Sequence, residues 1–591
     1  MRFGNDGPIS SSRMVRRRKP LPEDHKWKAK SRWCVGGHTD PDTGSLTTYS
    51  PTPQGEGMMA FMQTSLNLGH RFSFTDVRNA FCQSDKLVRP RGPIYASPCE
   101  GLGLPEGALI AIDVPVYGLD DAPAAWRTTV VRHLIDEMGY VRNLVEPCWF
   151  MKFEESSEGK KKNVSQILLE VDDFIVTALP SHEAEVERRL RERFHFGKWE
   201  RNEAEYAGRR VRVLHDRILV DQGKYIREQV RPVPLEKTRK QDKKSPLLKE
   251  EFEMLRSCIY KIPWLAKESR PEMAGLASIM ASRLTVATIE DVMTVNKCVN
   301  HLNNTADRAI TLWKFVPDEM SFVVVTDAGG ITTRPGEEDE MGLPVDATQG
   351  AWAVIATSHL PTGRERVKGS LLAWRSSKLK RKVFSSFGGE AQAMLQGINE
   401  VDWLQVMVRD AVIHDVQLRD WRNSLSPHML VLRGECQLHG RQQQCSVTDA
   451  KSLFDCILKE NPQGRQDRKA ALELAIVVKD LQETRSFVRW TPHQKNIVDS
   501  LTKIDPLKGN GAMEDFLKSG ILSLVDVKEE LENRASDPRF RRRSHSASVA
   551  RLLQEHQNDY MTLWSTLIWG NCEVVLEVFG GLLRAIDQRD M

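Results

Sequence analysis

The chain has 591 residues, of which 40% are hydrophobic and 28% are charged. This length and composition exclude a short disordered tail and predict roughly three or four folded domains. The net charge is only +4, from 84 Lys and Arg against 80 Asp and Glu, which excludes a uniformly basic nucleic-acid binder and leaves local basic patches as the source of any such affinity.

Ten cysteines are scattered along the chain without a CxxC pair, and Met1 is followed by a polar, Gly-rich and then basic segment. Neither a disulfide framework nor a targeting signal is indicated, so we expect a reducing intracellular setting. Cys436, His439 and Cys445 form a local cysteine and histidine cluster, but their spacing fits no familiar zinc module. We interpret them as ordinary residues.

Shifts in composition divide the chain into five segments. A Lys-rich stretch, LEKTRKQDKKSPLLKE, follows the first mixed region and is typical of an exposed linker. Helical periodicity dominates after it, and a β-rich start then introduces a mixed α/β region. The predicted segments are a basic N-terminus at 1–29, a globular unit at 30–234, a linker with helices at 235–315, an α/β domain at 316–510 and a tail at 511–591.

The first candidate site combines a strand with a hairpin. In ILLEVDDFIVTA, residues 167–178, two apolar arms flank Asp172 and Asp173, a pattern that predicts a β-hairpin with both acids at its tip. RFSFTDVRNAF places Asp76 at the end of another strand-like run. Aspartate is also common in plain turns, which is the competing interpretation of the pair. Three such carboxylates are what two divalent ions need for attack of a primer hydroxyl on a nucleoside triphosphate.

These acids belong to an ordered series of motifs. The series runs as KSRWCVGGHTDPDTGSLTTYSP (30–51), TDVRNAF, IYASPCEG (94–101), VYGLDDAPAAW (116–126), VEPCWF (145–150), VDD, FGKWERNEAEYAGRRV (196–211) and GKYI (223–226). Together they resemble the reverse transcriptase of copia-type long-terminal-repeat retrotransposons. The segment that begins YKIPWLAKESRPEM, with Arg270 and Pro271, resembles the helical connection region of that family. The resemblance implies a right-hand polymerase with fingers and palm at 30–234 and a thumb-like or connection part at 235–315.

The resemblance also implies roles for single residues. Asp76, Asp172 and Asp173 would bind the catalytic metals. Lys30 and Arg32 would contact the triphosphate as a point charge and a planar fork, unless they are ordinary solvated surface charges. Phe81 would lie under the incoming sugar as a steric gate that excludes a 2′-hydroxyl, with ordinary core packing as the alternative.

Two residues depart from the family pattern. Glu170 precedes VDD where the family usually has an aromatic residue. Asp121, counted among the expected substrate contacts, stands where the family has a polar amide. Both add negative charge near the expected position of the phosphates, and we expect weaker binding or fidelity from them.

A second acidic set lies in the α/β region. Asp327 closes a predicted strand, Glu390 enters a helix after two glycines, Asp449 ends a later strand and Asp499 lies at a helix start. This order behind a reverse transcriptase resembles a ribonuclease H-like domain, in which the four acids would hold two ions that cleave the RNA strand of a hybrid. His493 would assist proton transfer or product release, or is a plain loop histidine. Residues 418–444 are predicted to be an insertion of unknown purpose.

The fold class predicted from these motifs is multidomain, α+β in the polymerase part and α/β in the nuclease part. The function implied is an RNA-directed DNA polymerase with hybrid-specific ribonuclease H activity, using two Mg²⁺ ions per site with Mn²⁺ as a substitute. Its partners would be an RNA template, a DNA primer, the RNA–DNA hybrid and deoxynucleoside triphosphates, in the nucleus or in a cytoplasmic virus-like particle. A decayed nucleic-acid-binding relic, and an active nuclease on an inactive polymerase scaffold, remain alternatives.

The tail contains an apolar stretch from Tyr560 to Ile586 that is interrupted by Asn571, Glu573 and Glu577. Each central charge costs about 2 to 3 kcal/mol when such a helix enters a bilayer. We therefore predict a packed amphipathic tail and no stable membrane association.

Overall fold

The computed structural model divides the chain into two compact units, Met1–Val525 and Asp526–Met591, and the elements described below belong to the first. The residues that the structure describes are 9–20, 27–40, 42–90, 92–155, 159, 161–316, 320–330, 348–359, 361, 366–381, 383, 385–422, 444–458, 468–484, 486–525, 529–530 and 532–533.

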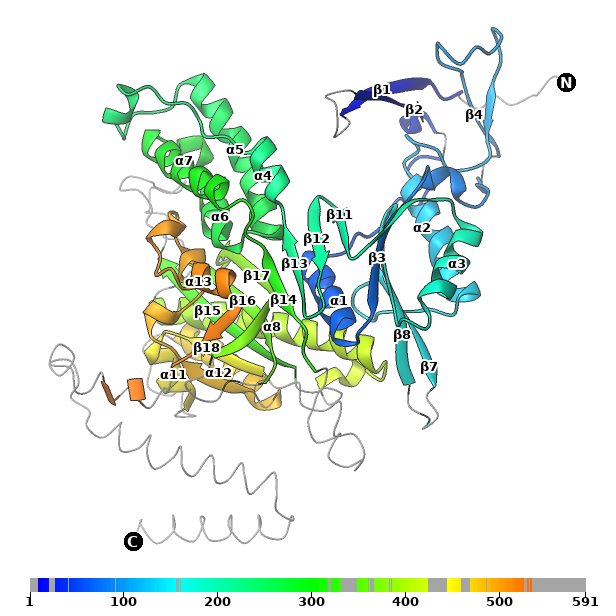
Figure 1. The fold of residues 1–591 in the computed structure, drawn as a ribbon. Helices are drawn as coiled ribbons and strands as arrows, with labels where there is room; N and C mark the ends of the chain where they lie inside the picture. Colours follow the sequence, from blue (N-terminus) through cyan, green and yellow to red (C-terminus); the bar gives the residue numbers. More distant parts are fainter. Residues whose placement is uncertain are drawn as a thin grey trace. The chain divides into compact units, whose positions relative to one another are not determined.

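The described strands form five sheets (Figure 1). The first six-stranded sheet contains, in spatial order, β10 (Phe196–Arg201), β3 (Arg71–Val77), β9 (Asp173–Ala178), β8 (Lys161–Glu170), β7 (Trp149–Glu155) and β6 (Val141–Arg142). A four-stranded sheet contains β11 (Glu203–Tyr206), β12 (Arg209–Val213), β13 (Arg217–Asp221) and β14 (Ile310–Trp313). The second six-stranded sheet contains β19 (Phe487–Trp490), β18 (Gln444–Thr448), β15 (Ser321–Gly330), β16 (Thr348–Thr357), β17 (Arg366–Lys378) and β20 (Ile521–Ser523). Two ribbons pair β1 (Ser12–Pro20) with β2 (Trp27–Val35), and β4 (Ile94–Ala96) with β5 (Ile110–Ile112).

The main α-helices of the described residues fall into groups that accompany these sheets. They are α1 (Gly55–Asn67), α2 (Ala122–Arg132), α3 (Glu183–Arg193), α4 (Gly223–Gln229), α5 (Lys249–Glu268), α6 (Ala274–Arg283), α7 (Ile289–Asn304), α8 (Ser386–Val412), α11 (Lys451–Leu458), α12 (Arg468–Glu483) and α13 (Ala512–Ser519).

The first six-stranded sheet is covered on both faces. Alternation along β3 sends Phe72 and Phe74 to the face where Phe61 of α1 packs. Phe174 of β9 faces the other side and joins Trp126 of α2 in a separate apolar cluster. Burial on both faces explains the short continuous apolar run from Phe174 to Val176 in β9.

Helices α5, α6 and α7 lie in the region where periodicity predicts helices. Their apolar faces form one cluster with residues of α4. It includes Leu255 and Ile262 of α5 and Val292 and Val299 of α7. Thr288 begins α7 with a capping box, because its side chain and that of Asp291 each accept from the other's backbone N–H.

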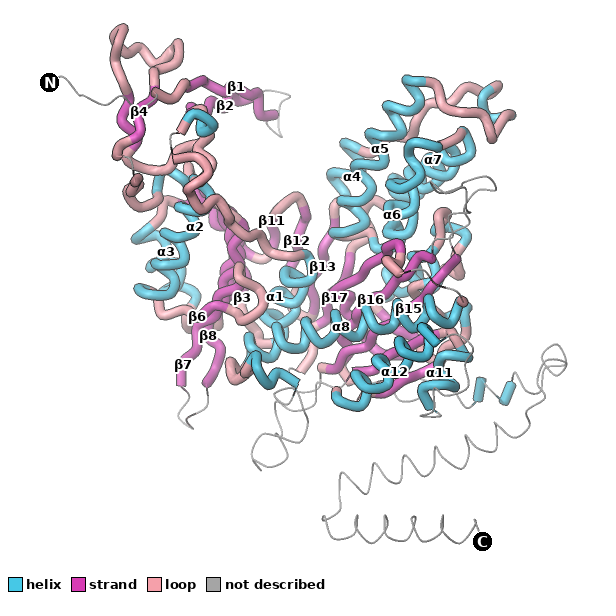
Figure 2. The backbone as a smooth tube through the Cα atoms, turned by 180° about the vertical axis from the view of Figure 1, so that it is seen from behind, coloured by secondary structure: helices cyan, strands magenta, loops and turns pink. Residues whose placement is uncertain are grey.

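The second six-stranded sheet combines an antiparallel meander, β15–β16–β17, with two strands that run parallel to β15, β18 next to it and β19 at the edge. Helix α8 packs against β15 and β16, and α12 packs on α8 (Figure 2). Ser385 caps α8, since its hydroxyl accepts a hydrogen bond of 3.3 Å from the backbone N–H of Gly388.

One apolar core runs from the first six-stranded sheet into the second. It includes Trp149 and Phe72 of the first sheet and Phe322 and Val354 of the second, all almost completely buried. Side-chain amides also cross the boundary, because Asn143 donates to the carbonyl of Met407 at 2.9 Å. The two sheets are therefore parts of one folded unit and stabilise each other.

Mixed α/β architecture with several sheets agrees with the predicted fold class, whereas the division into fingers, palm and thumb stays a prediction. The structure differs in two details. Asp327 lies inside β15, which continues to Gly330 because its last residues still pair with β16. Past residue 510, α13 and β20 pack with the second sheet, since β20 pairs with β17.

Several sequence predictions fall outside the described residues. These are the apolar tail stretch, Cys436, His439 and most of the 418–444 insertion. Within the part that is described, none of the helices is long and apolar enough to cross a membrane.

Candidate active sites

Three acids lie side by side across the first sheet. Asp76 of β3 stands opposite Asp173 of β9, which in turn stands opposite Glu170 of β8. Directly opposed residues of antiparallel strands share a face of the sheet, so these acids share one. Asp172 lies in the turn between β8 and β9, and its carbonyl accepts from the backbone N–H of Val77 at 2.8 Å.

The crowding of these acids alters their titration. The pKa of Asp173 rises to about 7 through burial and through the charges of Asp172, Glu170 and Asp76. Burial also raises the pKa of Asp172, while Arg32 and Lys30 act in the opposite direction. Negative charge thus accumulates here without enough fixed positive charge to balance it, which is the condition that a divalent cation relieves.

Lys30 and Arg32 lie two residues apart on β2, so they share one face of the ribbon, and both are exposed. The Arg32 guanidinium lies 4.9 Å from the centre of the Tyr117 ring. Phe81 is half-buried in a short 3₁₀ helix, η2 (Ala80–Gln83), and its ring centre is 5.1 Å from that of Tyr117. Tyr117 links the two predicted substrate contacts, and sequence reasoning missed it although it belongs to the VYGLDDAPAAW motif.

Asp121 is not an isolated charge. Its carboxylate pairs with Arg89 at 2.7 Å, and Arg89 also pairs with Asp40 at 3.1 Å. All three side chains are nearly buried, so removal of Arg89 would leave two buried carboxylates without a counter-charge. Arg89 thus neutralises part of the negative charge that the sequence predicts here. Similarly, the pKa of Glu170 is raised by burial, with the charge of Arg209 acting against that rise.

Gly197 of β10 is a second residue that sequence reasoning missed. A β-bulge separates Phe196 from Trp199, and it turns Gly197 toward the Asp76 carboxylate. A Cβ atom on Gly197 would lie 3.0 Å from Oδ2 of Asp76 and closer still to Oδ1. The signal was present, because a glycine inside a strand pattern indicates a bulge or a close approach.

We therefore predict that Gly197→Ala displaces the Asp76 carboxylate. If Asp76 holds a catalytic ion, primer extension should fall by about 100-fold, as expected for an ångström-scale misplacement. Cleavage of an RNA–DNA hybrid should be unchanged, because the second acidic set lies in another sheet. Lys198→Ala is the matched control, since Lys198 is exposed in the same bulge. Equal extension by the two variants would contradict the prediction.

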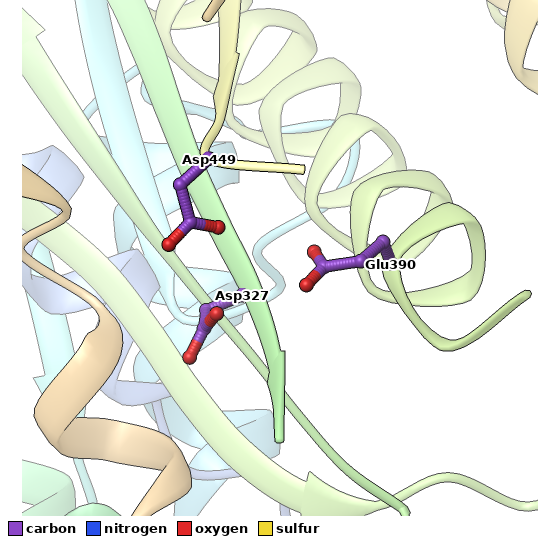
Figure 3. Close-up of side chains that lie close together, drawn as sticks. All are labelled: Asp327, Glu390 and Asp449. Carbon is purple, nitrogen blue, oxygen red and sulfur yellow. The ribbon is translucent and has the colours of Figure 1, made fainter. Parts of the chain in front are cut away.

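The second acidic set is more compact. Among the described residues, Asp327, Glu390 and Asp449 form the group whose ligand oxygens all lie within 4.8 Å of one another. Figure 3 shows the three carboxylates directed toward a common space. Strands β15 and β18 are adjacent and parallel. Because β18 ends at Thr448, its next residue, Asp449, lies beside Asp327. The first turns of α8 supply Glu390.

This trio repels itself strongly. Burial raises the pKa of Glu390 to about 9, and Asp327 and Asp449 add to that shift. The pKa of Asp327 rises to about 6 for the same reasons, while a hydrogen bond from Thr502 opposes the rise. The buried Oε2 of Glu390 has no hydrogen-bond partner among the residues that the structure describes. Three converging carboxylates with an unpartnered buried oxygen fit a hard divalent cation such as Mg²⁺.

Asp499 lies beside this trio at the start of a 3₁₀ helix, η9 (Asp499–Thr502), and is 1% exposed. It pairs with Lys503 at 3.3 Å and with Nε2 of His493 at 3.4 Å. The other ring nitrogen of His493 lies 3.0 Å from the carboxylate of Asp449. His493 therefore bridges two of the four predicted acids while it remains 55% exposed to solvent.

Two further residues complete this site and were missed by sequence reasoning. The hydroxyl of Thr502 donates to Oδ2 of Asp327 at 2.6 Å. The backbone N–H of Asn510 donates to Asp499 at 3.1 Å. These hydrogen bonds fix the carboxylates from outside the trio, in the way that outer partners orient metal ligands.

Comparison with known proteins gives weak matches. No protein-family model and no curated protein matches the chain. One solved structure is the foamy viral protease-reverse transcriptase in complex with double-stranded DNA, which is 12% identical with a TM-score of 0.35. The match covers 81% of this chain and 79% of the foamy viral chain. A second foamy viral protease-reverse transcriptase complex is 13% identical, with a TM-score of 0.37. The match covers 81% of this chain, which spans 66% of the length of that viral chain.

The N-terminal ribonuclease H domain of a Mycobacterium tuberculosis protein, solved as a fusion with maltose-binding protein, is 13% identical, with a TM-score of 0.18. The match covers 34% of this chain and 99% of the solved chain. At these identities and TM-scores the matches assign neither an activity nor a substrate.

Proposed function

We propose that the chain is an RNA-directed DNA polymerase with ribonuclease H activity, from a copia-type retrotransposon. The observation that carries the proposal is the convergence of Asp327, Glu390 and Asp449 in the same folded unit as a second carboxylate set on another sheet. The ordered motifs between residues 30 and 226 support the polymerase assignment.

At the nuclease site, Asp327, Glu390 and Asp449 would hold Mg²⁺, with Mn²⁺ as a substitute and Asp499 alongside. When bound, a pair of such ions activates a water molecule and stabilises the leaving oxygen of the cleaved phosphodiester. Thr502 keeps Asp327 oriented through its 2.6 Å hydrogen bond. His493 contacts Asp449 and is open to solvent, so it would assist proton transfer or product release at this site.

At the polymerase site, Asp76, Asp172 and Asp173 would hold the ions. Lys30 and Arg32 on the exposed ribbon would bind the triphosphate, and their positive charge favours the ionised form of Asp172. Phe81 would limit the space beside the sugar. Binding of template, primer and hybrid would depend mainly on phosphate contacts and would weaken with salt.

The test is primer extension on a poly(rA) template with Mg²⁺ or Mn²⁺, together with cleavage of a labelled RNA–DNA hybrid. Both activities are expected. Cleavage without extension would instead support a nuclease on an inactive polymerase scaffold. Salt-sensitive binding with neither activity would support a non-catalytic relic, and the proposal would be wrong.

Phe81→Ala tests the steric gate. The ring is only half-buried, so its removal should open space for a 2′-hydroxyl without collapse of the core. We expect kcat/KM for ribonucleotides to rise at least about tenfold relative to deoxyribonucleotides. Phe153→Ala, at a half-buried phenylalanine of β7, is the control and should leave this ratio unchanged.

An ordinary core role for Phe81 predicts a different outcome. Truncation of a core phenylalanine costs about 3 to 5 kcal/mol of unfolding free energy. A lower Tm with an unchanged sugar preference would therefore contradict the gate assignment.

A further inference from the structure

Trp126 of α2 contacts the turn that carries the paired aspartates. Its side chain is 1% exposed, and its indole N–H donates to the backbone carbonyl of Val171 at 2.6 Å. Val171 immediately precedes Asp172. An edge-to-face contact with Phe194, at 5.2 Å between ring centres, fixes the orientation of the indole. A rigid helix thus holds one end of the carboxylate-bearing turn.

The turn itself is strained. Val171 has a φ of 56°, in the left-handed region that β-branched residues strongly disfavour. Such a conformation persists only where the surroundings hold it. Two hydrogen bonds flank it, one from Trp126 to the Val171 carbonyl and one from Val77 to the Asp172 carbonyl. Without the indole donor, the backbone can relax and carry Asp172 away from Asp76.

The second acidic set has a matching contact. Trp490 of β19 is 2% exposed, and its indole N–H donates to the backbone carbonyl of Asp449 at 3.0 Å. The backbone N–H of Thr491 also donates to the carbonyl of Thr448 at 2.9 Å. Asp449 is therefore held from the neighbouring strand at the point where β18 ends.

A buried indole N–H usually has an acceptor, so the choice of acceptor is the informative feature. Trp313 donates to the carbonyl of Gly520, and Trp374 donates to the carbonyl of Ala266. Neither acceptor lies next to a predicted site residue. The indole N–H groups of Trp33 and Trp199 are buried without a partner among the described residues. Donation to a carboxylate-bearing segment is thus a property of particular tryptophans.

We propose that Trp126 and Trp490 are positioning residues, one for each active site, and that each indole N–H fixes the backbone segment that presents a metal-binding aspartate. The inference rests on the proposed function, since it requires that both acidic sets bind divalent ions. Neither residue would contact substrate.

The test replaces each tryptophan by phenylalanine in the full chain, which removes the donor and keeps an aromatic ring. Mn²⁺ binding is followed by electron paramagnetic resonance, in an Asp449→Asn background for the polymerase site and in an Asp173→Asn background for the nuclease site. We expect Trp126→Phe to weaken Mn²⁺ binding about tenfold at the polymerase site only, and Trp490→Phe to do so at the nuclease site only. The Mn²⁺ concentration for half-maximal activity should rise by a similar factor, for extension in the Trp126 variant and for cleavage in the Trp490 variant.

Trp313→Phe is the matched control, because it removes another buried indole donor and should lower Tm without a change at either metal site. Adding Val171→Gly to Trp126→Phe should restore part of the binding, since glycine adopts a positive φ without strain. The same addition to Trp490→Phe should restore nothing. A parallel loss at both sites in either single variant, or no rescue by Val171→Gly, would overturn the inference.

Failure of the proposed function has a different signature. In that case the parent chain itself would show no Mn²⁺ binding that Asp173→Asn or Asp449→Asn removes. If the parent chain binds Mn²⁺ at both sites and the tryptophan variants bind it equally well, only the positioning role is wrong.

Discussion

Asp449→Asn should abolish cleavage of an RNA–DNA hybrid and leave primer extension intact. The substitution keeps the size of the side chain and removes one of the three carboxylates that converge, the other two being those of Asp327 and Glu390. Loss of a metal ligand removes several kcal/mol of transition-state stabilisation, so we expect a fall of about 10³-fold in the cleavage rate. Cleavage of a labelled hybrid and extension of a labelled primer, on the same preparation, measure the two effects.

The shared core makes this result diagnostic. Because one apolar cluster includes residues of both six-stranded sheets, a variant that unfolds the protein should lose both activities together. Phe322→Ala in the centre of that cluster is the control for such a loss. A fall in extension that equals the fall in cleavage, in an Asp449→Asn protein with an unchanged Tm, would refute the two-site assignment.

The converse change, Asp173→Asn, should abolish extension and spare cleavage. Asp173 lies between Asp76 and Glu170 in the register of the first sheet, and its pKa is raised to about 7 by burial and by the surrounding acids. Removal of its charge relieves that repulsion, so we expect the metal-free protein to keep or raise its Tm. The same removal deletes a metal ligand, and extension should fall about 10³-fold.

A stable Asp173→Asn protein that still extends primers would show that Asp173 is not a ligand. Lys198→Ala, an exposed position on β10 of the same sheet, provides the baseline for surface substitutions. Restored extension with Mn²⁺ in place of Mg²⁺ would instead support a weakened but intact metal site, because Mn²⁺ tolerates imperfect ligand sets better.

Local patterns in the sequence determined much of the candidate chemistry. Apolar arms around Asp172 and Asp173 predicted the hairpin that β8 and β9 form. Apolar runs before Asp327 and Asp449 predicted strands, and these acids do lie in or just after β15 and β18. Such patterns are readable because alternation and turn chemistry depend on residues that are close in sequence.

Only the tertiary structure decided which of these residues meet and what holds them. Thr502 reaches Asp327 across 175 positions of sequence, and Asp121 finds Arg89 and Asp40 in a buried ion pair that no local pattern predicts. The close approach of Gly197 to Asp76 and the indole contacts of Trp126 and Trp490 likewise depend on strand register and helix packing. Register and packing are set by the whole folded core, because a shift of one residue in strand pairing would send every side chain to the opposite face of the sheet.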